Sequence, residues 1–426
     1  MAHPTSDYLA ELAWRGLLFQ HTDAAGEALA RGPVSGYCGF DPTGSSLHLG
    51  HLVPIMGLVH LQRAGHRPVA LVGGGTGMIG DPSGRSSERQ LITREQVEAN
   101  VRAIREQLGR FLDFSGTHAA HLLDNAEWLL RLGAVDLMRD VGKHFTVNYM
   151  LQKESVQTRL SSESGISYTE FSYMLLQAYD FLELHRREGV TLQVGGSDQW
   201  GNMTAGTALV RKAAGAEAHV VTFPLVTNAA GTKFGKTEGG TSVWLDAALT
   251  SPYRFYQFWI QVDDRDAGRY LRYFTLLPRE EIEALERAAA ERAERREAQQ
   301  ALARDVTARV HGAEAARAAV EVSGLLFGGG DAAGLSAAAL DLLRTEVPYA
   351  ELPERDGALD ALDLFVDAKL VASRGAAKRL LEQGGIYVNG RRVTPAERAV
   401  GSEALLHGGH LLLRKGAREY ALVRVR

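Results

Sequence analysis

The sequence predicts an α/β protein. Its core would be a doubly wound, Rossmann-like nucleotide-binding sheet with a connective insertion, followed by an α-helical domain and a small α+β domain. Three observations support this fold class. Strand and helix patterns alternate through the first third of the chain, a long run of helix-forming residues follows the middle, and the C-terminal residues change to a short basic helix and a hairpin signal.

The first third of the chain carries the strand–helix–strand pattern. Strands are predicted at residues 34–40 and 68–73, and helices at residues 47–64 and 93–112. Thr93 would cap the second helix, and Gln96, three residues later, would complete a capping box. Alternation of this kind predicts parallel strands with helices packed on the faces of the sheet.

An insertion is expected to divide this sheet in two. Residues 124–189 form a less regular stretch, after which strands at 190–194 and 219–226 flank a helix at 199–214. The second half of the sheet is therefore predicted to follow the insertion.

The remaining third is predicted to hold three parts. A long helix is expected at residues 279–309, and residues 331–360, with two prolines, are expected to form a loosely structured connector. An Asn389-Gly390 pair then signals a hairpin. The predicted domains are a catalytic domain at 1–225 with the insertion at about 124–189, a loop and linker at 226–250, a helical domain at 251–330, a linker at 331–360 and a C-terminal domain at 361–426.

Two short motifs point to phosphate chemistry. His48-Leu49-Gly50-His51 places two imidazoles three residues apart near the start of a predicted helix, where free backbone N–H groups can face an anion. Lys233-Phe234-Gly235-Lys236-Thr237 supplies two ammonium groups in a short loop. A triphosphate held from both sides is arranged for attack at its α-phosphorus with pyrophosphate leaving, so the pattern predicts an adenylating enzyme.

The whole pattern resembles the class I aminoacyl-tRNA synthetases, and among them the bacterial tyrosyl-tRNA synthetases. The two motifs match the HIGH and KMSKS signatures, although Phe234 and Gly235 stand where the general signature has Met and Ser, a departure expected to affect the kinetics of the loop. Residues 168–181 and 193–202 match the same family. The resemblance implies activation of L-tyrosine with ATP and Mg²⁺, transfer of tyrosine to tRNA(Tyr), and a homodimer formed through the insertion.

The resemblance also assigns roles to individual residues around the nucleotide. The implied catalytic residues are Thr43, His48, His51, Lys233, Lys236 and Thr237. The implied ATP-binding residues are Cys38, Gly39, Thr43, His48, Gly50, His51, Gly196, Asp198, Lys233 and Lys236. The lysines and Thr237 would close over the pyrophosphate, Asp198 would accept hydrogen bonds from the ribose, and Gly50 would leave room for the adenine.

The amino-acid pocket is implied in the same way. Tyr37 and Asp180 match the pair that reads the phenol, and Tyr173, Gln177 and Asp180 follow the spacing of one helix face. The implied tyrosine-binding residues are Tyr37, Asp41, Asp81, Tyr173, Gln177, Asp180, Gln193 and Gln199. The glycines of Gly73-Gly74-Gly75-Thr76-Gly77 lack the spacing of a phosphate loop, so a close approach of backbone to substrate is expected there.

The C-terminal domain resembles an S4-like RNA-binding domain. Its cations fall on a helix predicted at residues 370–383 and on the adjacent hairpin, the arrangement of a module that follows phosphates. The implied RNA-binding residues are Lys369, Arg374, Lys378, Arg379, Arg391 and Arg392.

Composition excludes some classes of protein. The net charge of −4 over 426 residues is not that of a chain coated with nucleic acid, so RNA contacts must come from local patches. No apolar run approaches the length of a membrane span, no basic signal peptide is evident, and the single cysteine fits a reducing cytoplasm. Scattered histidines offer no metal cluster, so neither a structural metal nor a prosthetic group is expected.

Two alternatives stay open. A tryptophanyl-tRNA synthetase would share the fold and the signatures, but an indole offers no O–H to Asp180 and Tyr37. A catalytically idle synthetase-like RNA-binding protein is disfavoured by intact His48, His51 and both lysines.

Overall fold

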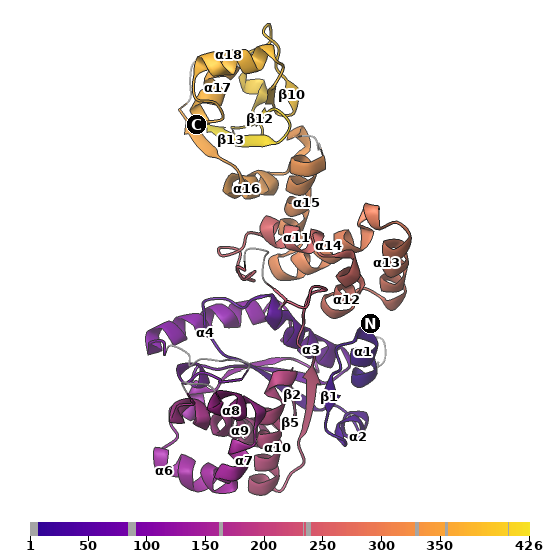
Figure 1. Cartoon of the computed structure of the whole chain (residues 1–426), viewed down its shortest axis with the longest axis vertical. Helices are drawn as coiled ribbons and strands as arrows, with labels where there is room; N and C mark the ends of the chain where they lie inside the picture. Colours follow the sequence, from indigo (N-terminus) through magenta and orange to yellow (C-terminus); the bar gives the residue numbers. More distant parts are fainter. Residues whose placement is uncertain are drawn as a thin grey trace. The chain divides into compact units, whose positions relative to one another are not determined.

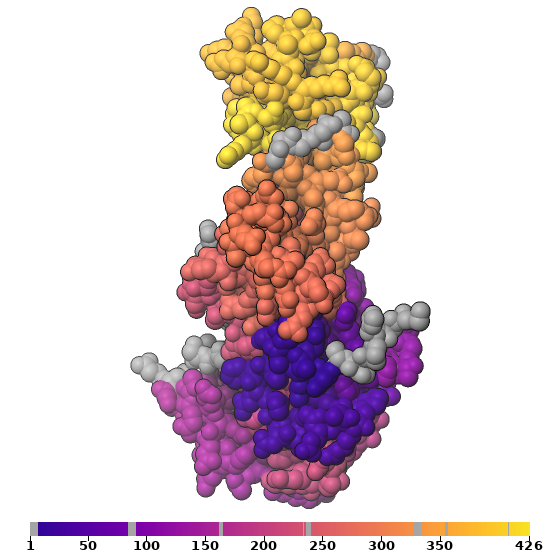
Figure 2. Space-filling model, turned by 90° about the vertical axis from the view of Figure 1, so that its right-hand side faces the viewer, coloured from indigo at the N-terminus to yellow at the C-terminus, as the bar shows by residue number. Residues whose placement is uncertain are grey.

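The computed structural model describes residues 7–83, 91–161, 165–232, 234–235, 240–328, 332–353, 357–407 and 409–426. The chain forms two compact units (Figure 1). They are Met1–Asp246 with Asp263–Ala298, and Ala247–Val262 with Gln299–Arg426. In Figure 2 the C-terminal residues, in yellow, adjoin the orange residues that precede them in the second unit.

The first unit is built on a six-stranded sheet in the order β1-β6-β5-β2-β3-β4. The strands are β1 (Gln20–His21), β2 (Ser35–Phe40), β3 (Arg67–Val72), β4 (His121–Asp124), β5 (Val190–Gly196) and β6 (His219–Phe223). Pairing is parallel except between β1 and β6. The order of the strands reverses between β2 and β5, and such a switch point opens a crevice at the carboxyl ends of the strands. The predicted doubly wound sheet is confirmed.

Helices cover both faces of this sheet (Figure 1). They are α3 (Leu52–Arg63) and α4 (Arg94–Leu108) on one face, and α9 (Tyr168–Glu188) and α10 (Trp200–Ala214) on the other. The predicted capping box at Thr93 and Gln96 is present at the start of α4. Helix α3 approaches the sheet closely at Gly57, where a Cβ atom would stand 2.1 Å from the Phe223 ring.

The insertion is more regular than the sequence indicated. Its short helices are α5 (Ala126–Leu129), α6 (Ala134–Asp136), α7 (Val147–Leu151) and α8 (Glu154–Leu160), and α9 follows. Arg159 on α8 and Glu170 on α9 form a buried ion pair at 2.8 Å. Because removing one partner would leave an unpaired buried charge, this pair holds α8 against α9.

The remaining helices of the first unit pack around this core. They are α1 (Tyr8–Arg15), α2 (Ala25–Ala30), α12 (Asp264–Phe274) and α13 (Arg279–Glu291). Arg15 donates to the carbonyl oxygens of Arg272 and Thr275, both at 2.9 Å, and so fixes α1 to the end of α12.

The prediction of a single helix at residues 279–309 was wrong. Helix α13 ends at Glu291 and α14 (Glu297–His311) begins after a break in which Arg296 takes a left-handed φ of 51°. No glycine or proline marks this break in the sequence, so helix propensity alone predicted one continuous element.

The second unit combines helices with a five-stranded sheet. Its helices are α11 (Pro252–Ile260), α14, α15 (Ala313–Gly328), α16 (Ala337–Glu346), α17 (Ala361–Asp367) and α18 (Arg374–Glu382). Its sheet has the order β10-β9-β12-β13-β7, from β7 (Tyr349–Leu352), β9 (Ile386–Val388), β10 (Arg391–Arg392), β12 (His410–Lys415) and β13 (Glu419–Val425). A separate pair joins β8 (Leu359–Asp360) to β11 (Ala399–Val400).

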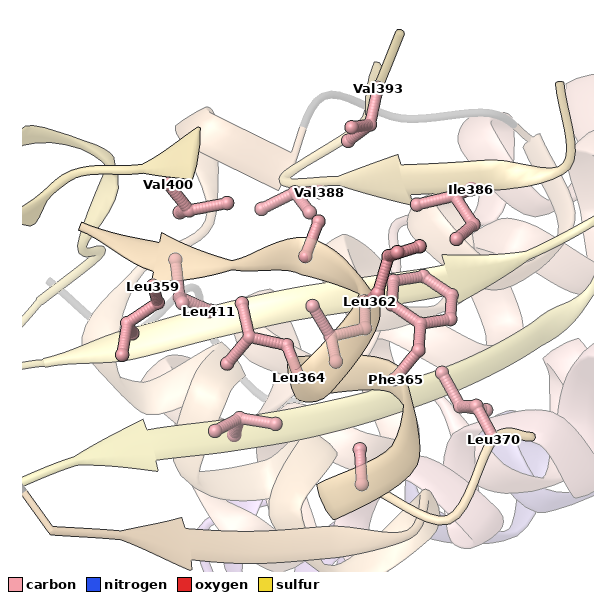
Figure 3. Packing of buried hydrophobic residues seen from close by; sticks show 14 of the residues in the cluster. Leu359, Leu362, Leu364, Phe365, Leu370, Ile386, Val388, Val393, Val400 and Leu411 are labelled. Atoms are coloured by element: carbon pink, nitrogen blue, oxygen red, sulfur yellow. The ribbon is translucent and has the colours of Figure 1, made fainter. Parts of the chain in front are cut away.

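Residues 331–360 are not a loose connector where the structure describes them. Helix α16 lies there, and β7 joins the C-terminal sheet in parallel with β13. The predicted hairpin is confirmed, because Asn389 and Gly390 take φ values of 48° and 80° between β9 and β10. Apolar side chains of α17, such as Leu362 and Phe365, pack on the sheet beside Ile386 (Figure 3).

Candidate functional site

A pocket of about 920 Å³ opens at the carboxyl ends of β2 and β5, at the switch point of the first sheet. It brings together residues from distant parts of the sequence. All tyrosine-pocket residues predicted from the sequence line it, namely Tyr37, Asp41, Asp81, Tyr173, Gln177, Asp180, Gln193 and Gln199. So do the described members of the predicted ATP set, namely Cys38, Gly39, Thr43, His48, Gly50, His51, Gly196 and Asp198.

Tyr37 and Asp180 face the deep end of this pocket. Tyr37 is 1% exposed, and its hydroxyl is buried without a hydrogen-bond partner among the described residues. Asp180 lies on α9 and is 3% exposed. An unpaired buried hydroxyl costs free energy unless a ligand supplies its partner, so this end of the pocket fits a ligand with a polar tip.

Asn125 and Trp128 hold the Asp180 carboxyl group. Asn125 donates to its Oδ2 at 2.9 Å, and Trp128 donates to its Oδ1 at 2.7 Å. Burial raises the pKa of Asp180 to about 8, and these two hydrogen bonds act in the opposite direction. Sequence reasoning missed both residues, although their position just after β4 puts them at the edge of the sheet where such sites form.

A second polar cluster lies nearer the ends of the strands. Asp41 accepts hydrogen bonds from Thr76 at 2.7 Å and from the Tyr173 hydroxyl at 2.8 Å. Asp81 accepts one from Gln199 at 2.7 Å. These two carboxylates give the pocket a negative wall suited to an ammonium group.

Helices α9 and α10 are linked across the same wall. Asn202 on α10 donates to Gln177 on α9 at 3.0 Å, and the Gln193 Oε1 atom is buried without a partner among the described residues. Thr76 and Asn202 were not among the predicted site residues, although they lie in two segments that the sequence marks, the glycine-rich loop and residues 193–202.

The two histidines of the first motif each accept a backbone hydrogen bond at Nδ1. The backbone N–H of Gly50 donates to His48 Nδ1, and that of His48 donates to His51 Nδ1, each at 3.1 Å. Since each Nδ1 accepts a hydrogen bond, a neutral ring carries its own proton on Nε2. The ring centroids stand 4.0 Å apart. Both rings border the main pocket and an adjoining cavity of about 560 Å³.

Gly50 is restricted by packing. A Cβ atom there would stand 2.9 Å from the His48 ring. Glycine at this position therefore preserves the arrangement of the two histidines. This reason is separate from the space for the adenine that the resemblance implied.

The second motif is brought beside the first. Leu49 donates to Val243 and Leu245 donates to Leu47 through their backbones, at 3.1 and 2.9 Å. Gly235, with φ of 88°, lies so close that a Cβ atom would stand 3.2 Å from Leu49. Phe234 stacks on Phe274 with ring centroids 5.2 Å apart. The remaining predicted residues of the motif, Lys233, Lys236 and Thr237, lie outside the described residues.

The glycine-rich loop after β3 meets protein groups as well as the pocket. Gly73 lines the cavity, whereas the N–H groups of Gly74 and Gly75 donate to Asp124 and Asn125, at 3.1 and 2.7 Å. The loop therefore supports the residue that holds Asp180. Among the residues that the structure describes, no group of three or more His, Cys, Asp or Glu side chains could hold a metal ion.

The basic residues of the second unit differ in their partners. Arg374 is engaged by Asp360, at 2.7 Å, and by Asp363. The other predicted RNA-binding residues form no ion pair within the described part of the chain, namely Lys369, Lys378, Arg379, Arg391 and Arg392.

Comparison with known proteins defines the class. The family described as tRNA synthetases class I (W and Y) matches residues 29–328, and the tyrosine–tRNA ligase SYY-like C-terminal domain matches residues 340–423. With the switch-point pocket and the histidine motif, this places the protein among the class I tRNA synthetases of the tryptophan and tyrosine group.

Full-length relatives narrow the class. A tyrosine–tRNA ligase of Roseiflexus castenholzii is 53% identical over 98% of this chain and 99% of its own, and one of Geobacillus stearothermophilus is 52% identical over the same shares. A C-terminally truncated mitochondrial tyrosyl-tRNA synthetase of Aspergillus nidulans superposes with a TM-score of 0.69 at 28% identity, over 76% of this chain and 94% of its own. The chain belongs to the tyrosine–tRNA ligase family.

Proposed function

We propose that the pocket of the first unit joins L-tyrosine to ATP and that the roles of its residues follow from their contacts. The activity of the chain is that of a tyrosine–tRNA ligase. The tyrosine carboxylate attacks the α-phosphorus of ATP, tyrosyl-adenylate forms and pyrophosphate leaves, and the tyrosyl group then passes to tRNA(Tyr). The attacking carboxylate needs no general base, so catalysis rests on positioning and on stabilising charge at the phosphates.

The main support for tyrosine as the substrate is the Tyr37 hydroxyl beside Asp180, which has no hydrogen-bond partner among the described residues. A phenol hydroxyl both donates and accepts a hydrogen bond, so one group on the substrate can satisfy Tyr37 and Asp180 together. An indole N–H only donates and leaves one of the pair unsatisfied. The pocket therefore fits tyrosine better than tryptophan.

The negative wall supports binding of the α-ammonium group. Asp81, held by Gln199, and Tyr173, held by Asp41, surround the middle of the pocket. An ammonium group presents three donors, and this cluster offers carboxylate, amide and phenol oxygens to receive them. Gln193, whose Oε1 is unpartnered, is proposed to contact the reacting end of the amino acid.

The histidine motif is proposed to bind the phosphates. Because Nδ1 of His48 and His51 accepts from the backbone, each neutral ring has its N–H on Nε2, and this group is proposed to donate to the phosphates of ATP. Thr43 adds a hydroxyl to the lining of the same pocket, and Lys233, Lys236 and Thr237 of the second motif are proposed to close over the pyrophosphate. Mg²⁺ is proposed to arrive with ATP, because phosphate oxygens and water supply most of its ligands at such sites.

A homodimer is proposed through the insertion. Five apolar side chains there are 48–73% exposed: Leu130, Val135, Met138, Val147 and Tyr168. Such a concentration of exposed apolar groups favours an interface. Sedimentation equilibrium tests it, and a concentration-independent monomer would contradict it.

The C-terminal domain is proposed to be S4-like and to bind tRNA(Tyr) through those cations on and beside α18 that form no ion pair among the described residues. A cytoplasmic location is proposed from the single cysteine, Cys38. Among the described residues, none of the helices is both long and apolar enough to cross a membrane.

Isolation of the intermediate tests the proposed first step. The protein is incubated with ATP, Mg²⁺ and radioactive tyrosine without tRNA, and the bound radioactivity is separated from free tyrosine. We expect tyrosyl-adenylate that transfers to added tRNA(Tyr). Transfer without any adenylate, or no transfer of a trapped adenylate, would contradict the two-step reaction.

A further inference from the structure

The second unit carries a row of side chains across three strands that the motifs did not reveal. Arg392 on β10 pairs in register with Tyr387 on β9, and Tyr387 pairs with Arg414 on β12. Directly paired residues point to the same face of a sheet, so these three side chains share one face. The row is defined here as Arg392, Tyr387 and Arg414.

This face is opposite the one that α17 covers. Ile386 and Val388, the neighbours of Tyr387 in β9, point into the apolar cluster with Phe365 (Figure 3). Because side chains alternate along a strand, Tyr387 points away from that cluster. Leu412 and Leu422 on the same face as Tyr387 pack against α15 and α16, and the row lies toward the β10 edge from them.

The row is arranged for stacking. The Arg414 guanidinium stands over the Tyr387 ring at 3.8 Å from its centroid, with Tyr387 and Arg414 half-buried and Arg392 exposed. Neither arginine forms an ion pair within the described residues. A guanidinium fixed on an aromatic ring keeps its charge and presents a flat surface, a combination that receives an unstacked base and its phosphate.

The edge strand joins the row to the basic helix on the other face. Arg391 pairs with Val388 and so points toward the face of α18, whereas the adjacent Arg392 points toward the row. An RNA strand that follows the cations of α18 therefore meets the row when it passes the edge of the sheet.

We propose that this row is a stacking site for an unpaired base of tRNA(Tyr), with Arg392 and Arg414 contacting the neighbouring phosphates. The proposal rests on the proposed RNA binding of this domain and adds a second surface to it. A looped or single-stranded segment fits, because its bases are free to stack.

The test measures the affinity of the full-length protein for tRNA(Tyr) over a range of salt concentrations. Tyr387→Leu removes the ring, and we expect affinity to fall by about fivefold or more with an unchanged salt slope. Tyr387→Phe keeps the ring and is expected to bind like the parent protein. Arg414→Gln is expected to weaken binding and to make the slope shallower by about 0.7. Pyrophosphate exchange should stay normal in all three.

Two controls separate the outcomes. Lys378→Gln with Arg379→Gln tests α18 alone. If that pair weakens binding and Tyr387→Leu does not, the stacking site is wrong and RNA binding by the domain stands. If neither set changes affinity, RNA binding by the domain fails as well. Should Tyr387→Leu unfold the domain in a thermal melt, Arg414→Gln decides, and unchanged affinity and slope there would overturn the proposal.

Discussion

At the scale of single residues, we propose that buried polar atoms select the substrate. Tyr37 has an unpartnered hydroxyl, and Asp180 is fixed by donors on both carboxyl oxygens. A substrate that lacks the hydroxyl leaves the Tyr37 hydroxyl without a partner, whereas tyrosine completes the network. Specificity for tyrosine would therefore come as much from the free-energy cost of leaving a buried polar group unpaired beside another amino acid as from the hydrogen bonds that tyrosine forms.

Replacement of Tyr37 by Phe tests this reading. It removes one hydroxyl and leaves the ring, so we expect kcat/KM for tyrosine activation to fall by about fivefold, equivalent to ~1 kcal/mol, and the preference over phenylalanine to narrow. The measurement is pyrophosphate exchange with both amino acids. An unchanged tyrosine-to-phenylalanine ratio would show that Tyr37 does not read the hydroxyl.

The protonation of Asp180 makes stability depend on pH. Burial raises its pKa from 3.8 to about 8, so between those values the folded protein binds more protons than the unfolded chain. The free energy of unfolding of the tyrosine-free protein should therefore fall as pH rises through this window. Asp180→Asn, which cannot ionise, should flatten that fall in urea unfolding measured at several pH values, with Tyr37→Phe as the control. An equal pH slope in Asp180→Asn and the parent would contradict the assignment.

Regular spacing along one helix face marks some of the pocket residues in the sequence. Tyr173, Gln177 and Asp180 share one helix face, and the motif resemblance named them. Asn125 and Trp128 were missed because they reach Asp180 from more than fifty residues away, through a sheet edge whose position only the fold defines. The sequence around Asn125 and Trp128 gives no indication of such a long-range contact.

At the scale of elements, helix packing on the sheet sets the position of the histidine motif. Helix α3 begins directly after His51 and lies close to β6 at Gly57. The strands and helices of the first third were predictable because their periodicity reflects this burial. The break after α13 was not, since no glycine or proline marks it and helix propensity alone predicts one continuous element.

Gly57→Ala tests the close approach. Its Cβ atom would stand 2.1 Å from Phe223, so we expect the free energy of unfolding to fall by about 1–3 kcal/mol. Gly26→Ala is the matched control, because its Cβ atom meets only an ordinary contact at 3.5 Å from Leu9 and alanine favours a helix. Chemical unfolding measures both. If both variants had the same free energy of unfolding, helix α3 would be able to move away from Phe223 without loss of stability.

At the scale of the whole molecule, chemistry and the proposed RNA binding lie in different compact units. A chain ending at Ala350 should keep tyrosine-dependent pyrophosphate exchange and lose most charging of tRNA(Tyr). The retained exchange controls for folding of the first unit. Normal charging by this shortened chain would show that the C-terminal domain is dispensable.

The same truncation should also lower solubility. Leu412 and Leu422 cover apolar residues of α15 and α16, and removing them exposes that cluster. The sequence predicted a loose connector at this point because its two prolines are typical of a linker. Pairing of β7 with β13, a long-range contact, is what makes the segment part of the domain.

Pyrophosphate exchange with each of the twenty amino acids, at equal concentration and with ATP and Mg²⁺, tests the central claim most directly. The Tyr37 and Asp180 pair predicts exchange with tyrosine, a far slower reaction with phenylalanine, and none above background with tryptophan. Exchange with tryptophan at a rate comparable to tyrosine would contradict this account of the pocket.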